Sequence, residues 1–229
     1  MFDITIDLNL LEKQIIAYEE EPVVKGKIVF YGHSLFTRWG HPKWGFRRMD
    51  EDIRLKDGSL AVVNRGFGTS TSEELLYYYD RIVRPLEPRS LVIATFGNDT
   101  MYGYGPKDVM TNVSKLCHWA RTDFPGIRIY LMEPTPAPKD KNFPRRDAWN
   151  SKLQMRRSYT EMLDIYAQTH EDTQVIHLWN RPVFFETPED VGDYHKVRED
   201  IYAEDMGHFN QAGYDIFKEI ILEALDDIL

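Results

Sequence analysis

The chain has 229 residues, which is long enough for one large α/β domain with a substantial core. It carries 28 basic and 37 acidic residues, and this net charge of −9 without a basic stripe argues against a nucleic-acid partner. No run approaches the ~20 apolar residues of a membrane span, and residues 1–22 do not resemble a secretory signal. We therefore expect a soluble, cytoplasmic protein with no membrane partner. The single cysteine, Cys117, rules out an intramolecular disulfide and indicates a buried thiol.

Short apolar runs alternate with helical patterns along most of the chain. Residues 1–24 precede this pattern as an N-terminal appendage, in which 10–18 could form a short amphipathic helix, and residues 25–229 form the main domain. Apolar runs predict buried strands at 27–31, 60–63, 91–96, 127–132 and 175–178. Helical spacing follows at 72–83, 106–122, 149–169 and 210–229, with Ser72 expected to cap the first of these helices.

Strands that alternate with helices favour a parallel sheet covered by helices on both faces. Functional sites in such folds gather at the carboxyl ends of the strands. Ser34 comes just after the first predicted strand, Gly68 and Thr69 just after the second, and Asn98 just after the third. The proline-rich segment 133–144 leaves the fourth strand at the same edge, where it could form the rim of a pocket.

Two fragments carry the residue types of nucleophilic catalysis. Ser34 is a candidate nucleophile, and a serine hydroxyl needs a base within hydrogen-bond reach. His208 is the candidate base, and Asp205, about one turn earlier, can orient its ring and stabilise the imidazolium. The alternative is that Asp205 and His208 are ordinary loop residues before a last helix capped by Asn210.

An acyl-transfer site also needs hydrogen-bond donors for an oxyanion. The Asn98 amide and the backbone N–H groups of Ser34 and of either Gly68 or Thr69 are the candidates. Taken alone, the fragments around Ser34 and Asn98 are more typical of turns, whereas Asp205 and His208 suit a loop and a catalytic pair equally. Only the complete set favours catalysis.

Taken together, the fragments resemble the SGNH, or GDSL-like, hydrolases, whose blocks run Ser, Gly, Asn and then Asp-x-x-His. The stretches 63–68 and 75–81 further resemble a bacterial lipase/acylhydrolase branch, and the similarity spans roughly residue 25 to the C-terminus. The resemblance implies a flavodoxin-like three-layer α/β/α sandwich with a central parallel sheet of about five strands. It also implies metal-independent ester hydrolysis through an acyl-serine intermediate, with no cofactor.

Three positions depart from the family pattern. His33 stands where the first block usually has Asp, and it could alter the charge beside the nucleophile. Thr69 replaces a second glycine of the next block, so the backbone donor could be either Thr69 or Gly68. Phe96 stands where a glycine usually lies two residues before the asparagine. None of these changes removes a catalytic group.

Aromatic residues close to the site hint at a carbohydrate substrate, because such rings can stack on sugars. The alternative is that these rings cover the edge of the core. Arg38 could bind a substrate anion or pair with a surface acid, and we favour the acid. The candidate pocket residues are His33, Arg38, Trp39, Trp44 and Tyr102, with Phe46 and Tyr104 nearby.

The sequence therefore predicts a serine esterase or acylhydrolase acting on a short-chain ester, with acetyl favoured, of a carbohydrate or other small alcohol. The expected partner is this small-molecule ester, possibly an acetylated sugar. One alternative is a catalytically weak, carbohydrate-binding relative, and another is a thioesterase, which would use the same residues. A metal hydrolase built on His33, Asp205 and His208 is a further alternative, but no known metal-binding spacing supports it.

Overall fold

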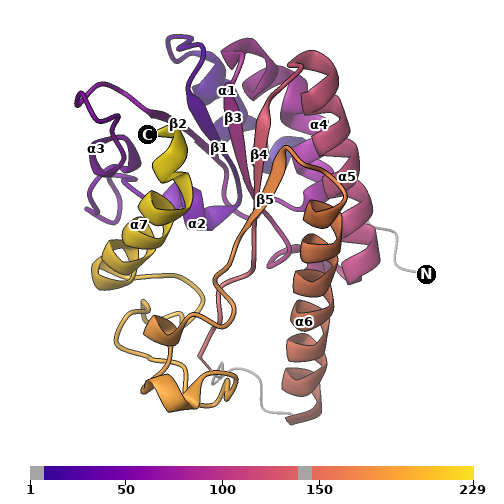
Figure 1. Ribbon diagram of the computed structural model, residues 1–229, viewed down its shortest axis with the longest axis vertical. Coiled ribbons are helices and arrows are strands. Elements are labelled where there is room, and N and C mark those ends of the chain that lie inside the picture. The colour runs from indigo at the N-terminus through magenta and orange to yellow at the C-terminus, as the bar shows by residue number, and fades with distance from the viewer. Residues whose placement is uncertain (1–7, 139–145) are drawn as a thin grey trace.

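The centre of the fold is a sheet of five parallel strands in the order β2-β1-β3-β4-β5 (Figure 1). The computed structural model describes residues 8–138 and 146–229. This strand order is that of flavodoxin-like folds, so the predicted parallel sheet is confirmed. The strands are β1 Ile28–Gly32, β2 Val62–Gly66, β3 Ser90–Ala94, β4 Arg128–Met132 and β5 Thr173–Ile176.

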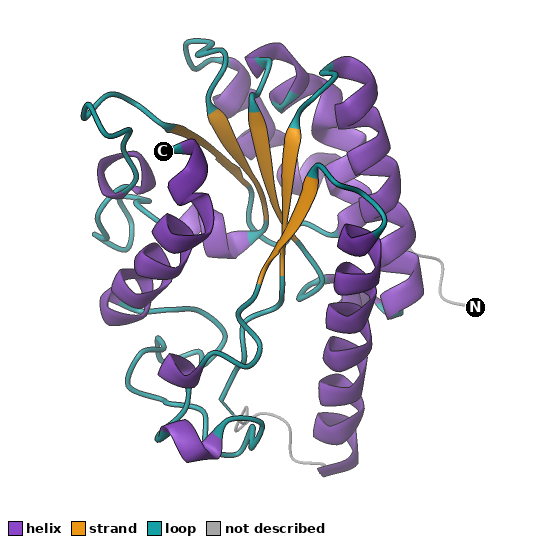
Figure 2. Cartoon of the chain, in the orientation of Figure 1, coloured by secondary structure: helices purple, strands orange, loops and turns teal. Residues whose placement is uncertain are grey.

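Helices cover both faces of the sheet and complete three layers (Figure 2). One face carries α1 Leu8–Glu19, α4 Ser72–Ile82, α5 Pro106–Asp123 and α6 Arg146–Gln168. The other carries the short helices α2 Ser34–Arg38 and α3 Met49–Asp52, together with α7 Gln211–Leu225. Of the helices in the described ranges, none is both long enough and apolar enough to cross a bilayer.

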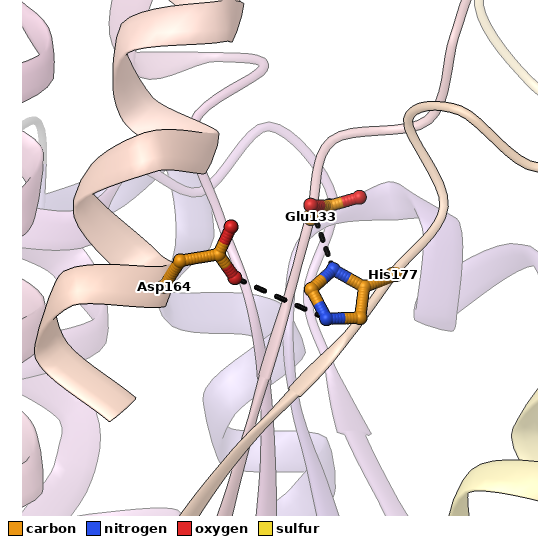
Figure 3. Close-up of side chains that lie close together, drawn as sticks. All are labelled: Glu133, Asp164 and His177. Carbon is orange, nitrogen blue, oxygen red and sulfur yellow. Dashed lines mark hydrogen bonds and ion pairs between the residues drawn. The ribbon is translucent and has the colours of Figure 1, made fainter. Parts of the chain in front are cut away.

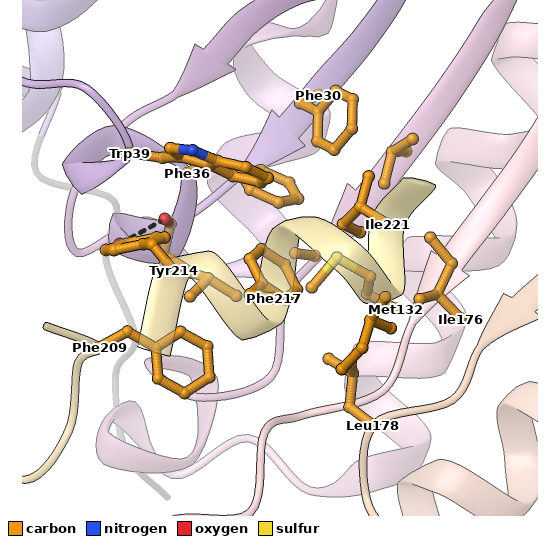
Figure 4. Close-up of a cluster of buried hydrophobic side chains, with 14 of the residues drawn as sticks. Phe30, Phe36, Trp39, Met132, Ile176, Leu178, Phe209, Tyr214, Phe217 and Ile221 are labelled. Carbon is orange, nitrogen blue, oxygen red and sulfur yellow. Dashed lines mark hydrogen bonds between the residues drawn. The ribbon is translucent and has the colours of Figure 1, made fainter. Parts of the chain in front are cut away.

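The strands contribute side chains to two hydrophobic cores, one on each face, because successive side chains of a strand point to opposite faces of the sheet. Ile28 and Phe30 of β1 pack toward α2 and α7, as Figure 4 shows for Phe30, while Val29 and Tyr31 pack toward α4 and α5. Cys117 lies in the second core, as predicted, and burial raises the pKa of its thiol to about 12.

The boundaries of several elements differ from the sequence prediction. β2 lies a little later than expected because Asn64 and Arg65 continue the pairing with β1, up to the pair Gly66↔Gly32. β5 lies earlier than expected, at Thr173–Ile176. Thr71, not Ser72, caps α4: the side chain of Thr71 accepts a hydrogen bond from the Glu74 N–H, and that of Glu74 accepts one from the Thr71 N–H. α2 and α3 have too few turns for a periodic signal.

The N-terminal helix α1 packs onto α4 beside the carboxyl end of β2. Leu11 and Ile15 are buried in the same core as α4. Arg81 on α4 makes ion pairs of 2.7 Å with both Glu12 and Glu19. The hydroxyl of Tyr18 donates to the carbonyl of Gly66, so α1 reaches the sheet edge at which the candidate site lies.

Two glycines allow the strands and α2 to approach closely at this edge. A Cβ on Gly32 would lie 2.3 Å from the carbonyl oxygen of Ala94 on the neighbouring strand. A Cβ on Gly66 would lie 2.5 Å from the Cβ of Phe36 in α2. Both contacts are much shorter than normal packing distances, so this edge has no room for larger residues.

Replacing Gly32 with alanine should lower the free energy of unfolding by about 1–3 kcal/mol, because overpacking a filled interior forces the backbone to move. Urea denaturation measures the change. Gly97→Ala is the matched control, since an added Cβ there meets nothing within 4 Å. Equal losses of stability in the two variants would contradict this account.

Candidate active site

The nucleophile candidate Ser34 is the first residue of α2, immediately past the carboxyl end of β1. The first N–H groups of a helix have no partner within the helix. His33 satisfies those that follow Ser34: its Nδ1 accepts from the Leu35 N–H at 3.3 Å, and its carbonyl accepts from Phe36 and Thr37. Among the described residues the Ser34 N–H has no acceptor of this kind, so it is available to a ligand.

Ser34, His208 and Asp205 form one hydrogen-bonded chain. The distance from Ser34 Oγ to His208 Nε2 is 2.7 Å, and that from His208 Nδ1 to Asp205 Oδ2 is 2.9 Å. The other carboxylate oxygen of Asp205 accepts the backbone N–H groups of Gly207 and His208, each at 3.0 Å. Met206, inside this turn, has a φ of 51°. The three residues predicted from sequence thus come together in the arrangement of a nucleophile, a base and an orienting acid.

The surroundings favour a neutral His208 and an ionised Asp205. Burial, followed by the nearby charge of Arg38, lowers the pKa of His208 despite its hydrogen bond to Asp205. Desolvation opposes ionisation of Asp205, but the hydrogen bonds from the Gly207 N–H and from His208, together with the charge of Arg38, still hold the pKa of that carboxyl below its usual value. A neutral imidazole beside an ionised carboxylate is the state in which a histidine can accept a proton.

For Arg38, the sequence favours pairing with a surface acid over binding a substrate anion. Its Nη2 lies 3.0 Å from Asp205 Oδ2, and its guanidinium lies over the ring of Trp44, at 4.8 Å from the centroid. Its partner is therefore the acid that orients His208.

His33 acts as a helix cap rather than as a charged group. Burial, together with the charges of His208 and Arg156, lowers the pKa of His33 to about 4. The ring is therefore neutral at neutral pH and adds no charge beside Ser34. An aspartate could cap α2 in the same way, but it would add a negative charge at this point.

The segment after β2 offers one free backbone donor. The N–H of Gly68 is already bound to the side-chain oxygen of Gln14 on α1, at 3.0 Å. Within the described part of the chain, the Thr69 N–H has no such acceptor, and Thr69 has a φ of 66°, the left-handed conformation that favours glycine. The geometry thus separates the two donors that the sequence could not distinguish.

Asn98 is held at the end of β3 by its neighbours. One hydrogen of its amide goes to the carbonyl of Ser70 at 2.9 Å, which leaves the second hydrogen for a ligand. The fully buried carboxylate of Asp99 fixes this turn by accepting from the Ser72 N–H, the Thr95 hydroxyl and the Phe96 N–H at 2.8–2.9 Å. Sequence reasoning missed Asp99, although it directly follows Asn98.

Phe96, two residues before Asn98, is a second position at which this chain has a larger residue where the family pattern has glycine. Phe96 has a φ of 97°, which is unfavourable for a bulky residue. Its buried ring stacks on Tyr159, with centroids 4.4 Å apart and planes 8° apart. This packing explains how a phenylalanine is tolerated at a position that suits glycine.

A cavity of about 780 Å³ opens beside Ser34. Its wall includes α1, which supplies Leu11, Gln14 and Tyr18. Arg38 and Trp44 line it too. The remaining lining includes the four site residues Ser34, Thr69, Asn98 and His208, together with Gly68.

Other predicted pocket residues lie elsewhere. Trp39 is buried in the core beside α7 (Figure 4). Its indole N–H donates to Asp52 at 2.8 Å. Tyr102, half exposed, is not among the residues that line the cavity, and neither is His33. Phe46 packs on Tyr214, and the hydroxyl of Tyr104 donates to Glu73.

Of the proline-rich segment 133–144, residues 139–144 lie outside the described residues. The first residues of that segment do not line the cavity beside Ser34.

The metal-hydrolase alternative has no support in this cavity. Among the described residues, the acidic and histidine side chains close enough to share a metal ion are Glu133, Asp164 and His177. They follow β4 and β5 or lie on α6, away from Ser34 and His208.

The sequence from residue 30 to residue 216 matches the GDSL-like Lipase/Acylhydrolase family. The chain belongs to this family. It is accordingly a hydrolase of ester bonds, as the sequence predicts. Helix α1 lies before the matched region, so the family pattern itself does not include this wall of the cavity. None of the curated protein sequences compared with the chain matches it.

Solved structures share the fold at low sequence identity. A GDSL-like lipase from Bacteroides thetaiotaomicron is 20% identical with a TM-score of 0.70, over 95% of this chain and 98% of that one. A lipase/acylhydrolase from Enterococcus faecalis is 18% identical with a TM-score of 0.63, over 88% and 96%. An acetyl xylan esterase is 15% identical with a TM-score of 0.65, over 87% and 99%.

Replacing Arg38 with glutamine should raise the pKa of His208, because a nearby positive charge that disfavours the imidazolium is removed. Histidine NMR titration measures the shift, with the His208 signal assigned by its loss in His208→Gln. Arg84→Gln, a change at an arginine away from this site, is the control and should leave the pKa of His208 unchanged. An unchanged or lower pKa in Arg38→Gln would show that Arg38 does not act on His208 in this way.

Proposed function

We propose that the protein is a serine esterase in which Ser34 is the nucleophile, His208 the general base and Asp205 the orienting acid. The observation that carries the proposal is the unbroken chain from Ser34 Oγ through both ring nitrogens of His208 to Asp205, at 2.7 and 2.9 Å, open to a cavity. The proposal is consistent with the hydrolase family to which the chain belongs.

In the first half of the reaction, Ser34 Oγ attacks the ester carbonyl carbon while His208 Nε2 takes the hydroxyl proton. The tetrahedral intermediate collapses, the bond to the alcohol oxygen breaks, and His208 returns the proton to the leaving alcohol. In the second half, His208 removes a proton from water, which attacks the acyl-serine. Collapse then releases the acid and restores the Ser34 hydroxyl. Asp205 stays ionised and stabilises the imidazolium at each stage.

The negative oxygen of each tetrahedral intermediate needs donors that are already in place. We assign this role to the N–H of Ser34, the N–H of Thr69 and the free amide hydrogen of Asn98. Gly68 is excluded from this set, because its N–H is occupied by Gln14 at 3.0 Å. Gln14 thereby becomes a positioning residue: it holds the loop that presents the next N–H to the oxyanion.

The substrate we favour is a short-chain ester, with acetyl preferred, of a carbohydrate or other small alcohol. Trp44 lines the cavity beside the polar side chains of Lys43 and Thr37, so the wall offers both apolar and polar contacts to a sugar. Arg38 and Lys43 lie over the Trp44 ring, so the contact with a sugar would use the part of the ring that these cations leave uncovered. A volume of about 780 Å³ is within the usual range for small-molecule sites. One structural relative is an acetyl xylan esterase, which agrees with this choice.

Ser34→Ala should abolish hydrolysis of p-nitrophenyl acetate, measured by release of nitrophenolate with a chelator present. Loss of the nucleophile removes the covalent route, and removing a member of such a triad typically costs ~10⁴–10⁶ in kcat. Ser151→Ala, at an exposed serine of α6, is the matched control and should retain full activity. Equal turnover by the wild type and Ser34→Ala would reject Ser34 as the nucleophile.

The same assay distinguishes the alternatives. Binding of acetylated sugars without turnover by the wild type would favour a carbohydrate-binding relative. Faster turnover of acyl thioesters than of matched oxygen esters would favour a thioesterase with the same residues.

Gln14→Leu should lower kcat for p-nitrophenyl acetate by about 10-fold, less than the ~10²–10³ for deleting an oxyanion donor outright. The Thr69 N–H is still present in this variant but is less well placed. Gln14→Glu keeps the oxygen that accepts the Gly68 N–H and should retain most of kcat. If both variants lost kcat equally, the hydrogen bond from Gly68 would not be the cause.

A further inference from the structure

A second group of polar side chains lies at the same edge of the sheet as the serine site, beyond β4 and β5. Glu133 is the first residue after β4, and His177 is the first after β5. Asp164 faces them from the C-terminal part of α6, as Figure 3 shows. In the strand order, β4 and β5 lie two and three strands away from β1, which is the strand that precedes Ser34.

Glu133 is fixed by its own hydrogen bonds. It is buried, with 4% of its surface exposed, and its Oε2 accepts the N–H groups of Leu178 and Trp179 at 2.7 and 2.8 Å. Its Oε1 lies 3.0 Å from Nδ1 of His177. This contact orients the imidazole and directs Nε2 toward Asp164 (Figure 3). A carboxylate that binds one ring nitrogen of a histidine is the usual support for a metal on the other.

The gap between His177 and Asp164 is too wide for a hydrogen bond. Nε2 lies 3.9 Å from Asp164 Oδ1. A divalent ion such as Zn²⁺ binds nitrogen and oxygen ligands at ~2.0–2.2 Å, so two such bonds can span ~4 Å. Both side chains are partly exposed, at 59% and 41%, so they can adjust toward a smaller angle at the metal and can be reached from solvent.

An independent observation comes from Thr160, one turn before Asp164 on α6. Its hydroxyl is buried and has no hydrogen-bond partner among the described residues, although the side chain lines the same cavity of about 600 Å³. A buried hydroxyl without a partner is costly, so a shift of the Thr160 side chain toward a metal-bound water in this cavity would be favoured. Glu161 also lines this cavity and adds negative charge.

Positive charge near the cluster is partly compensated. Arg181 lines the cavity, but it is bound to Glu223 at 2.6 Å and to the His177 carbonyl at 3.0 Å. Arg157 also lines the cavity and will reduce its affinity for a cation. The carboxylates of Glu133, Asp164 and Glu161 outnumber these two arginines.

We propose that His177 and Asp164, supported by Glu133, form a binding site for a divalent transition-metal ion of the Zn²⁺ type. His177 Nε2 and a carboxylate oxygen of Asp164 are the protein ligands, and water completes the coordination. The ion links α6 to the end of β5, and the contact of Glu133 with His177 extends this link to the end of β4. This site is separate from the serine site, so ester hydrolysis by Ser34 does not depend on it.

Calorimetric titration of chelator-stripped, full-length protein with ZnCl₂ at pH 7.5 tests the proposal. We expect one equivalent to bind and the midpoint of thermal unfolding to rise with Zn²⁺ concentration. His177→Ala and Asp164→Asn should abolish both effects, while Glu133→Gln should weaken binding by about 10- to 100-fold through loss of ligand orientation. His118→Ala, at an exposed histidine of α5, is the control and should bind like the wild type.

Two results would overturn the proposal. One is the absence of both heat and stabilisation when Zn²⁺ is added to the wild type. The other is undiminished binding in His177→Ala, which would place the ion elsewhere, for example at His208. Neither result depends on turnover, so the metal site can fail while the serine esterase proposal stands, and the reverse also holds.

Discussion

The parallel pairing of β1 with both of its neighbours determines where the functional groups of this protein lie. Gly32 pairs with Gly66 on one side and with Ala94 on the other, so three strands end at the same level. Their loops then leave together and carry Ser34, Thr69 and Asn98 to one edge. A one-residue slip in either pairing would turn every side chain of the slipped strand to the other face. The close approaches at Gly32 and Gly66 make this register specific.

The segment that contains Asp205 and His208 comes from the C-terminal part of the chain. Ser34 and His208 are separated by 174 positions, and the docking of α7 on α2 brings them together. Trp39 packs on Tyr214 and Phe217, and the Tyr214 hydroxyl donates to the Leu35 carbonyl at 2.8 Å. The aromatic core shown in Figure 4 is therefore also the support of the proposed catalytic pair. Local opening of α7 would separate the base from the nucleophile without unfolding the sheet.

Much of the fold and of the candidate site could be predicted from sequence, because both depend on local signals. Apolar runs marked the strands, and the residues just past them marked the edge at which Ser34 and Asn98 lie. The Asp205–His208 spacing suited a hydrogen bond within one turn. Long-range packing had no such signal. Trp39 and Trp44 are both aromatic residues shortly after the nucleophile, yet only Trp44 lines the cavity, because α7 covers Trp39.

The contact of α1 with the loop after β2 could not be predicted from sequence either, because it too depends on long-range packing. Gln14 is one polar residue in an amphipathic helix, and its contact with Gly68 spans 54 positions. The pairing of Arg38 with Asp205 likewise follows from the position of α7 rather than from any motif. Asp99 could have been found, since a carboxylate beside Asn98 at the end of a buried strand has few ways to be satisfied except by the turn itself.

Thr69, Phe96 and Met206 share an unfavourable backbone conformation, and each lies within two residues of a proposed site residue or is one itself. Such conformations cost of the order of 1–3 kcal/mol each and persist only where the surrounding structure enforces them. Replacing Thr69 with glycine or asparagine should raise the heat tolerance of the protein, because the change relaxes the backbone of an exposed residue that has little packing to lose. The same change at Phe96 would be costly, because it removes a buried ring that stacks on Tyr159. The gain at Thr69 would loosen the loop that presents its N–H, a proposed oxyanion donor. Resistance to heat and speed of turnover should consequently be hard to improve together in this enzyme.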